Sequence, residues 1–263
     1  MLRRVSPLQF DRATTQGRTQ PSFVTCECDD GTTVELVAKF SGGCDEGNIN
    51  LAREVIGACL AGDLSLPIPE PFLIEISPEW SATIPEDARR TKIQQSSTVA
   101  FGSRVMTRQF NVWNPGNLVS DIMLPTAASI FVFDAVIQNP DRRSENPNCL
   151  IRGDELRIFD HELAFSHGLV LGWLPPWRPG GLKSLEINGN HIFRAGLKGR
   201  IIDYVPIRAA WMGLSDAKIA GYEAALPAEW TNVAAAAASA TQLIRDARDN
   251  IDAVLAEVKR VLT

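Results

Sequence analysis

The most informative segment of the chain reads Asn139-Pro140-Asp141-Arg142-Arg143-Ser144-Glu145-Asn146-Pro147-Asn148, here called the Asp141 segment. It places an asparagine, Asn146, five positions after the acid Asp141. A further acid, Asp160, follows the apolar, strand-like run 156–159. Mg²⁺ prefers oxygen ligands, and the protein usually supplies only one or two of them while substrate phosphates supply others. Asn146 and Asp160 fit that requirement, which leaves Asp141 to orient a hydroxyl group.

The chain up to about residue 110 is predicted to be rich in β-strand. Strand-forming residues dominate four runs, at 23–28, 34–40, 72–76 and 98–106. The turn signal Asp29-Asp30-Gly31-Thr32 joins the first two runs into a hairpin. One helix is expected at 49–60, where Leu51, Val55 and Leu60 recur at helical spacing.

After about residue 118 the pattern becomes helical. Residues 125–137 are apolar on most faces, which indicates a buried helix. A short hairpin is predicted at 149–159, and one long amphipathic helix over 243–262. We therefore expect an α+β, two-lobed fold of the protein-kinase type. Its β-rich N-lobe would span residues 1–110, its mainly α-helical C-lobe residues 111–263, and a ligand cleft would lie between them.

Composition limits the partners and the compartment. The net charge of −5 indicates no basic face of the kind that binds nucleic acid. No run approaches the roughly 18 apolar residues of a membrane span, and the N-terminus lacks the apolar core of a signal peptide. The five cysteines are scattered without a Cys-x-x-Cys pair, which argues against a structural zinc site. We expect a cytoplasmic protein with no direct nucleic-acid or membrane partner.

Phosphate-binding groups are predicted near the N-terminus. Lys39 ends a strand and can reach α- and β-phosphates, although a lone strand lysine is more often solvated. Glu54, on the following helix, is the expected partner that holds Lys39 extended, with Glu46 as the competitor. Backbone amides and small polar groups for phosphate oxygens would come from the loop of Gly17, Arg18, Thr19 and Gln20. One glycine is a weak signal by itself, and an ordinary surface turn explains it equally well.

Phosphoryl transfer requires an aligned hydroxyl, a held metal and neutralised phosphate charge. Asp141 is the candidate general base or hydroxyl-orienting group. Asn146 and Asp160 are the candidate Mg²⁺ ligands. An Asp-x4-Asn spacing arises often by chance in loops, so Asp160 after the hairpin makes the pattern more selective.

Four neighbouring residues receive lesser or alternative roles. Arg142 and Arg143 either stabilise the transferred phosphate or form salt bridges. Asp134, in the middle of the apolar helix, is interpreted as a buried network acid without a catalytic role. His161 is interpreted as a structural histidine whose ring nitrogens are satisfied, with a cleft residue as the alternative.

With these residues in place, the chain resembles the HipA-like kinases, in particular their compact members. The resemblance rests on the Asp141 segment with Cys149-Leu150, and on Ile158-Phe159-Asp160-His161-Glu162-Leu163-Ala164-Phe165. Thr15-Gln16-Gly17-Arg18-Thr19-Gln20-Pro21 and the Lys39 strand agree with that family's phosphate loop and ATP lysine. The resemblance implies a kinase-like fold, ATP and Mg²⁺, and phosphorylation of a protein Ser/Thr hydroxyl. It also raises membership of a toxin–antitoxin pair with a DNA-binding antitoxin partner.

The motifs depart from those of ordinary protein kinases. Asn139-Pro140-Asp141 stands where those kinases have His-Arg-Asp, and Asp160-His161-Glu162 stands where they have Asp-Phe-Gly. Relatives in the HipA-like group often place a histidine two residues after the catalytic acid, where this chain has Arg143. These departures argue against an ordinary eukaryotic-type kinase.

Two other functions stay open on the same scaffold. A small-molecule or lipid kinase would use the same residues, but 163–182 is apolar and rich in Pro and Trp, with Arg178 as its only strong base. That composition disfavours an anionic lipid surface. A nucleotide-binding pseudokinase is the non-enzymatic alternative, and the joint presence of the lysine, both acids and the asparagine counts against it.

Overall fold

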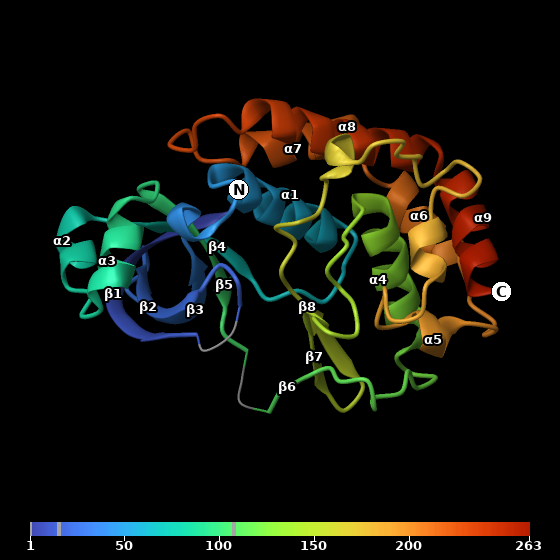
Figure 1. Ribbon diagram of the computed structural model, residues 1–263, viewed down its shortest axis with the longest axis horizontal. Helices are drawn as coiled ribbons and strands as arrows, with labels where there is room; N and C mark the ends of the chain where they lie inside the picture. The colour runs from blue at the N-terminus through green and yellow to red at the C-terminus, as the bar shows by residue number, and fades with distance from the viewer. Residues whose placement is uncertain (1, 15–16, 107–108) are drawn as a thin grey trace.

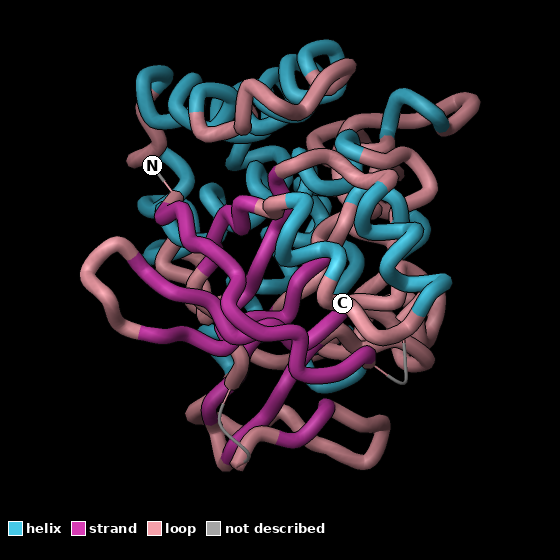
Figure 2. Tube along the Cα trace, turned by 90° about the vertical axis from the view of Figure 1, so that its left-hand side faces the viewer, coloured by secondary structure: helices cyan, strands magenta, loops and turns pink. Residues whose placement is uncertain are grey.

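The computed structural model describes residues 2–14, 17–106 and 109–263, and it is a mixed α+β structure, as the sequence predicts. A strand-rich part and a helix-rich part lie next to each other (Figure 1). Seen from the strand-rich side, the strands lie in front of most of the helices (Figure 2). The strands are β1 (Arg3–Ala13), β2 (Ser22–Cys28), β3 (Thr33–Lys39), β4 (Pro71–Glu75), β5 (Val99–Arg104), β6 (Asn111–Val112), β7 (Cys149–Arg152) and β8 (Glu155–Ile158).

The helices frame these strands and continue to the C-terminus. They are α1 (Asn48–Asp63), α2 (Pro78–Ala82), α3 (Asp87–Gln94), α4 (Leu124–Ile137), α5 (Arg194–Leu197), α6 (Val205–Met212), α7 (Asp216–Ala224), α8 (Ala234–Asp249) and α9 (Ile251–Leu262). Short 3₁₀ turns occur at Ser41–Gly43, His167–Leu169 and Lys183–Glu186. No helix within the described ranges is both long and apolar enough to cross a membrane.

A closed five-stranded barrel forms the strand-rich part, in the order β1-β2-β3-β5-β4. Four of the five pairings are antiparallel, and β1 closes the barrel by pairing in parallel with β4. Successive side chains of a strand point to opposite faces. Ala38 therefore lies in the barrel core, where it is buried together with Leu36, and Lys39 points out of the barrel. This alternation aims the lysine at the rest of the protein.

Helix α1 joins the barrel to the helical part, because it is buried on both sides. Leu51 and Val55 pack against Val99 of the barrel. Ile56 and Leu60 belong to the large core that also contains α4, α8 and α9. A helix buried on two faces holds its polar residues in a fixed position, and Glu54 is one of them.

Helix α4 is buried over nearly its whole length, as the apolar pattern predicts. Leu124 and Pro125 start it, and proline is well suited to the first turn, where its missing N–H is not needed. Gln138 ends it in the left-handed conformation, with φ of 54°. The Asp141 segment begins at the next residue, so the end of α4 fixes where that segment starts.

The C-terminal prediction of one long helix is wrong. The chain breaks at Asn250 (φ −112°, ψ 23°), which separates α8 from α9. The Asn250 side chain donates to the Asp246 carbonyl at 2.8 Å and so satisfies one of the last carbonyls of α8. Apolar residues on both sides of the break, such as Ile244 and Val258, enter the same core. The apolar periodicity therefore runs through the break, which shows only in the backbone angles of Asn250 and in its capping contact.

Candidate functional site

A cleft of about 460 Å³ lies between the barrel, α1 and the Asp141 segment. We call it the main cleft. It brings together most of the predicted site residues, which come from five separate segments of the chain. Those that line it are Gly17, Arg18, Thr19, Lys39, Glu54, Asp141, Asn146 and Asp160.

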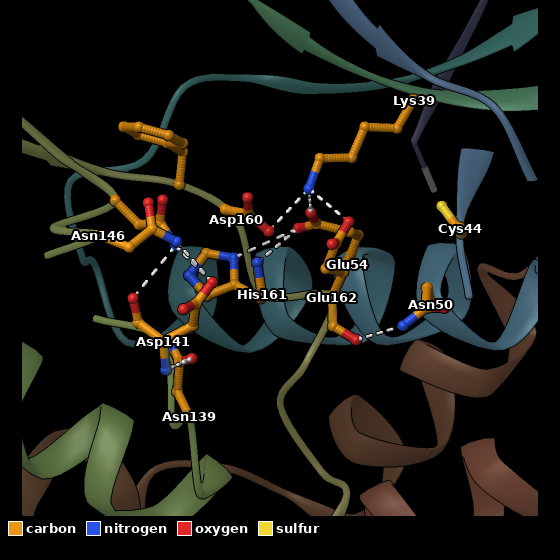
Figure 3. Close-up of polar contacts among 12 residues, drawn as sticks. Lys39, Cys44, Asn50, Glu54, Asn139, Asp141, Asn146, Asp160, His161 and Glu162 are labelled. Carbon is orange, nitrogen blue, oxygen red and sulfur yellow. Dashed lines mark hydrogen bonds and ion pairs between the residues drawn. The ribbon is translucent and has the colours of Figure 1, made fainter. Parts of the chain in front are cut away.

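Lys39 lines this cleft and sits among three carboxylates (Figure 3). Its Nζ donates to Glu54 Oε1 at 2.5 Å, to Asp160 Oδ1 at 2.7 Å and to Glu162 Oε2 at 2.8 Å. Burial alone would lower the pKa of Lys39, but these three charges raise it well above its ordinary value. The ammonium group is therefore charged, and the solvated-lysine alternative does not apply.

Glu54 is the α1 acid that contacts Lys39, whereas Glu46 pairs with Arg53. The second oxygen of Glu54 accepts the backbone N–H of His161 at 2.9 Å. Burial would raise the pKa of Glu54, but Lys39 and His161 hold it well below its usual range. A charged, doubly bonded carboxylate fixes the lysine on one side and the residue after Asp160 on the other.

Glu162 is the site residue that the sequence reasoning missed. It is buried, its carboxylate contacts Lys39, and its backbone carbonyl accepts from Asn50 Nδ2 at 2.9 Å. Burial raises its pKa to about 7, despite the opposing charge of Lys39. The available signal was a second acid two positions after Asp160.

Asp141 and Asn146 meet across a tight turn in the Asp141 segment. Backbone hydrogen bonds between Arg143 and Asn146, at 3.2 and 3.1 Å, close the turn. Asn146 Nδ2 then donates to Asp141 Oδ2 at 2.6 Å, and Asn148 Nδ2 approaches the same oxygen at 3.4 Å. Because the Asn146 amide nitrogen makes this bond, Oδ1 is the atom that Asn146 can offer to a metal.

The half-buried Asp141 carboxylate has a raised pKa. Burial is the larger cause, and the nearby charge of Asp160 adds to it, while Asn146 opposes it. Its backbone N–H donates to Asn139 Oδ1 at 3.1 Å, which sets the direction of the side chain. A carboxylate with a raised pKa is a better proton acceptor than an ordinary aspartate.

A buried ion cluster of Asp134, Arg142 and His191 supports the Asp141 segment. Arg142 is wholly buried and donates through Nε to Asp134 Oδ2 at 2.6 Å. His191 Nε2 lies 3.1 Å from the same oxygen, and Asn139 Nδ2 donates to Asp134 Oδ1 at 3.0 Å. Of the two roles considered for Arg142, the buried salt bridge is therefore the one observed. Asp134 is the network acid that the sequence suggested.

The pKa values in this cluster agree with fixed charges. Burial would raise the pKa of Asp134, but Arg142 and His191 hold it well below its usual range. Burial lowers the pKa of His191, so its ring is neutral near pH 7. Arg143 differs from Arg142, because half of its side chain is exposed and its Nε lies 3.7 Å from Asp141 Oδ1.

His161 packs against α1 at a position where only glycine fits. A Cβ on Gly57 would lie 2.8 Å from the Cβ of His161. The buried ring meets Phe133 edge-on at 5.5 Å, which matches the structural interpretation, and His161 also lines the main cleft, as the alternative has it. Its Nε2 has no hydrogen-bond partner among the described residues, so the expectation of a fully satisfied histidine is wrong.

The predicted phosphate loop connects β1 to β2 and reaches the main cleft. Gly17 adopts φ of 103°, a conformation that favours glycine. Thr19 is buried, and Arg18 forms an exposed ion pair with Asp45 at 2.7 Å. Gln20 does not line the cleft, because its side chain accepts from Lys92 Nζ at 2.9 Å. Thr15 and Gln16, also part of the family resemblance, lie outside the described residues.

The sequence profile of HipA-like kinases matches residues 9–260. The chain belongs to the HipA-like kinase family. Among solved structures, a Helicobacter pylori proinflammatory kinase, CtkA, is similar at a TM-score of 0.49 and 11% identity, over 91% of this chain and 95% of that one. No curated protein matches the chain.

In this HipA-like kinase the three carboxylates around Lys39 suit a hard cation. Glu54, Asp160 and Glu162 each offer an oxygen, and these atoms lie within 4.8 Å of one another. One ammonium among three carboxyl groups leaves an excess of negative charge near pH 7. A divalent cation with a preference for oxygen ligands would neutralise that excess.

Proposed function

We propose that this HipA-like kinase uses ATP and Mg²⁺ to phosphorylate a Ser or Thr hydroxyl of a protein. The barrel would act as the N-lobe, and the helical part as the C-lobe, of a two-lobed kinase arrangement. One observation carries the proposal. Lys39 Nζ contacts both Glu54, at 2.5 Å, and Asp160, at 2.7 Å, although 121 positions separate Lys39 from Asp160. Kinases require a phosphate-binding lysine beside a metal-binding acid, because this arrangement places the phosphates next to the metal.

The walls of the main cleft suit a nucleotide. Val37 and Phe101 of the barrel and Ile158 of β8 line the cleft and would provide apolar surface for a purine ring. Lys39 and the backbone of the loop from Gly17 would bind phosphate oxygens. A volume of about 460 Å³ lies within the range of small-molecule sites.

Asn146 Oδ1 and Asp160 are the proposed ligands of Mg²⁺, which would neutralise charge on the transferred phosphoryl group. Asp141 orients the acceptor hydroxyl and accepts its proton. The bond from the γ-phosphorus to the bridging oxygen of ATP breaks, and a bond to the hydroxyl oxygen forms. The products are ADP and a phosphorylated Ser or Thr. The raised pKa of Asp141 favours its part in this transfer.

The test compares γ-phosphate transfer from labelled ATP to proteins of a host lysate by the wild type and by Asp141→Asn. We expect Mg²⁺-dependent labelling by the wild type and loss of labelling by the variant, with ATP binding retained in calorimetry. Asp29→Asn, in the exposed β2–β3 turn, is the matched control and should behave as the wild type. Undiminished transfer by Asp141→Asn would sink its assignment, and absence of any transfer by the wild type would sink the kinase proposal.

The toxin role, a DNA-binding antitoxin partner and a cytoplasmic location stay predictions from the sequence and the family resemblance. Co-purification of the chain with the product of a neighbouring gene that encodes a helix-turn-helix protein would support the first two.

A further inference from the structure

A second cavity, of about 530 Å³, shares the Asp141 segment as a wall with the main cleft. Asn139, Pro140 and Arg143 line the second cavity, whereas Asp141 and Asn146 line the main cleft. The same few residues therefore separate a site that suits a nucleotide from a site without an assigned ligand. An acceptor segment bound in the second cavity would lie next to the Asp141 segment and would leave the main cleft free for the nucleotide.

Hydrogen bonds hold the walls of the second cavity in place. Trp173 Nε1 donates to Gln138 Oε1 at 3.0 Å, and Gln138 Nε2 donates to the Ala135 carbonyl at 2.5 Å. The ring of His167 lies 4.7 Å from that of Trp173. The Asp141 segment is itself fastened next to the lining residue Asn190, because Ser144 N donates to the Gly189 carbonyl at 2.9 Å.

Two basic side chains line this cavity, although the whole chain carries a net charge of −5, and one of them, Arg143, also forms an ion pair with Asp141. Arg143 is half-exposed and Lys183 is exposed. Lys183 forms no ion pair with any residue in the described ranges. Among the described lining residues the one carboxylate is Asp134, which is fully buried and neutralised by Arg142. Burial lowers the pKa of His167, so this histidine adds no charge near pH 7.

Exposed aliphatic side chains follow the same rim. Val170 and Leu174 line the cavity and are 56% and 50% exposed. Leu169 and Leu171, next to them, are 73% and 103% exposed. Four large aliphatic side chains exposed within six residues form the kind of patch that marks an interaction site.

We propose that the second cavity binds the acceptor as an acidic protein segment, in which carboxylates and an apolar residue flank the Ser or Thr. The proposal rests on the kinase function above and names its substrate class. The substrate carboxylates would face Arg143 and Lys183, and the apolar side chain would cover Val170 and Leu174. Arg143 Nε lies 3.7 Å from Asp141 Oδ1, about the span of one extended residue. A carboxylate held by Arg143 would therefore lie close to the acceptor hydroxyl.

A protein segment fits these observations better than a membrane. Anionic membranes attract clusters of about four to eight basic residues, whereas this rim has two. The net negative charge of the chain opposes such a surface as well. A walled cavity beside the catalytic acid suits an extended chain that inserts side chains.

The test measures transfer of labelled γ-phosphate to a position-scanned library of Ser-containing peptides. We expect the wild type to prefer peptides with Glu beside the serine over matched peptides with Gln or Lys. Lys183→Glu should lower kcat/KM for the Glu peptides about tenfold and raise it for the Lys peptides, because like charges repel across the contact. The KM for ATP should not change, because Lys183 lies outside the main cleft. Lys198→Glu, at another exposed lysine that does not line the cavity, is the matched control.

A second variant tests the apolar part independently of charge. Leu174→Ser should raise the KM only for peptides with a leucine near the serine. Equal use of Glu, Gln and Lys peptides by the wild type, or an unchanged preference in Lys183→Glu, would overturn the proposal. Labelling of lysate proteins without labelling of any library peptide, or flotation of the protein with phosphatidylserine vesicles that Lys183→Glu abolishes, would overturn it while the kinase function stands.

Discussion

Two buried ion clusters lie on either side of the Asp141 segment, and they are built differently. In one, Lys39 faces three carboxylates, and the side chain of Asp160 is 23% exposed to the cleft. In the other, Asp134 faces Arg142, and both side chains are completely buried. The first cluster has excess negative charge and an opening, whereas the second is balanced and closed.

The difference between the two clusters separates ligand binding from structural support of the Asp141 segment. A balanced pair of buried opposite charges with hydrogen-bonded neighbours can fix a backbone segment without any ligand. An open cluster with excess negative charge is costly until a cation enters it. We infer that the Asp134 cluster holds the Asp141 segment in shape and that the Lys39 cluster carries the chemistry.

Asp134→Asn should produce the largest loss of stability. It leaves the Arg142 guanidinium buried without a counter-charge, and removal of one partner of a buried pair costs about 3–5 kcal/mol. Denaturant unfolding measures this loss, and Asp29→Asn in an exposed turn is the control. A loss of unfolding free energy below about 1 kcal/mol would show that the Asp134 cluster does not support the Asp141 segment.

The same cluster predicts an acid-dependent loss of stability. The folded-state pKa of Asp134 lies below its unfolded value, so the folded state binds this proton more weakly than the unfolded state does. The stability that the Asp134 carboxylate contributes is therefore fully present above its unfolded pKa near 3.8, and it is lost as pH falls towards the folded pKa. Unfolding free energies of wild type and Asp134→Asn should converge as pH falls below about 4. Parallel curves across that range would contradict this assignment.

Lys39→Met tests the other cluster by activity. Loss of one charged donor at a reacting group typically lowers the rate by about 10²–10³-fold. We expect that reduction in γ-phosphate transfer per folded molecule, with the folded fraction taken from circular dichroism. Lys198→Met, outside both cavities, should retain the wild-type rate. A rate within a factor of about three of wild type would contradict the role of Lys39.

The sequence predicted the parts of the site that local patterns encode. Strand alternation places Lys39 outside the barrel, and helical spacing places Glu54 on the following helix, so both could be named from the sequence. The five-residue spacing of Asp141 and Asn146 was also found, because one short turn closes it. Glu162 was missed because its contact with Lys39 spans 123 positions, and its one local signal is that it is a second acid two positions after Asp160.

The sequence also did not predict the long-range contacts that connect the segments. Asp134 was expected in a network, but its partner His191 lies 57 positions away and has no periodic signal. The break at Asn250 was missed because the apolar pattern of α8 runs on into α9. Residues 77–97 contain few apolar residues, and their two helices, α2 and α3, were not predicted for that reason.

Gly57→Ala should have a moderate effect by moving α1 away from the Lys39 cluster. The added Cβ would lie 2.8 Å from His161 Cβ, and overpacking of this kind costs about 1–3 kcal/mol. Gly62→Ala in the same helix is the matched control, because nothing lies within 4 Å of its added Cβ. That control should be neutral or stabilising, since alanine favours helix over glycine. Equal effects of the two variants on denaturant unfolding would show that the contact with His161 is not tight.

Glu162→Gln should have the smallest effect on stability and so gives the sharpest contrast with Asp134→Asn. Lys39 keeps Glu54 and Asp160 as partners, and the raised pKa of Glu162 indicates that its charge is unfavourable where it lies. Removal of that charge should leave the unfolding free energy within about 1 kcal/mol of wild type or increase it. Thermal and denaturant unfolding without nucleotide measure the change. A loss as large as that of Asp134→Asn would mean that both clusters support the fold, and the distinction between an open cluster for ligands and a closed cluster for support would fail.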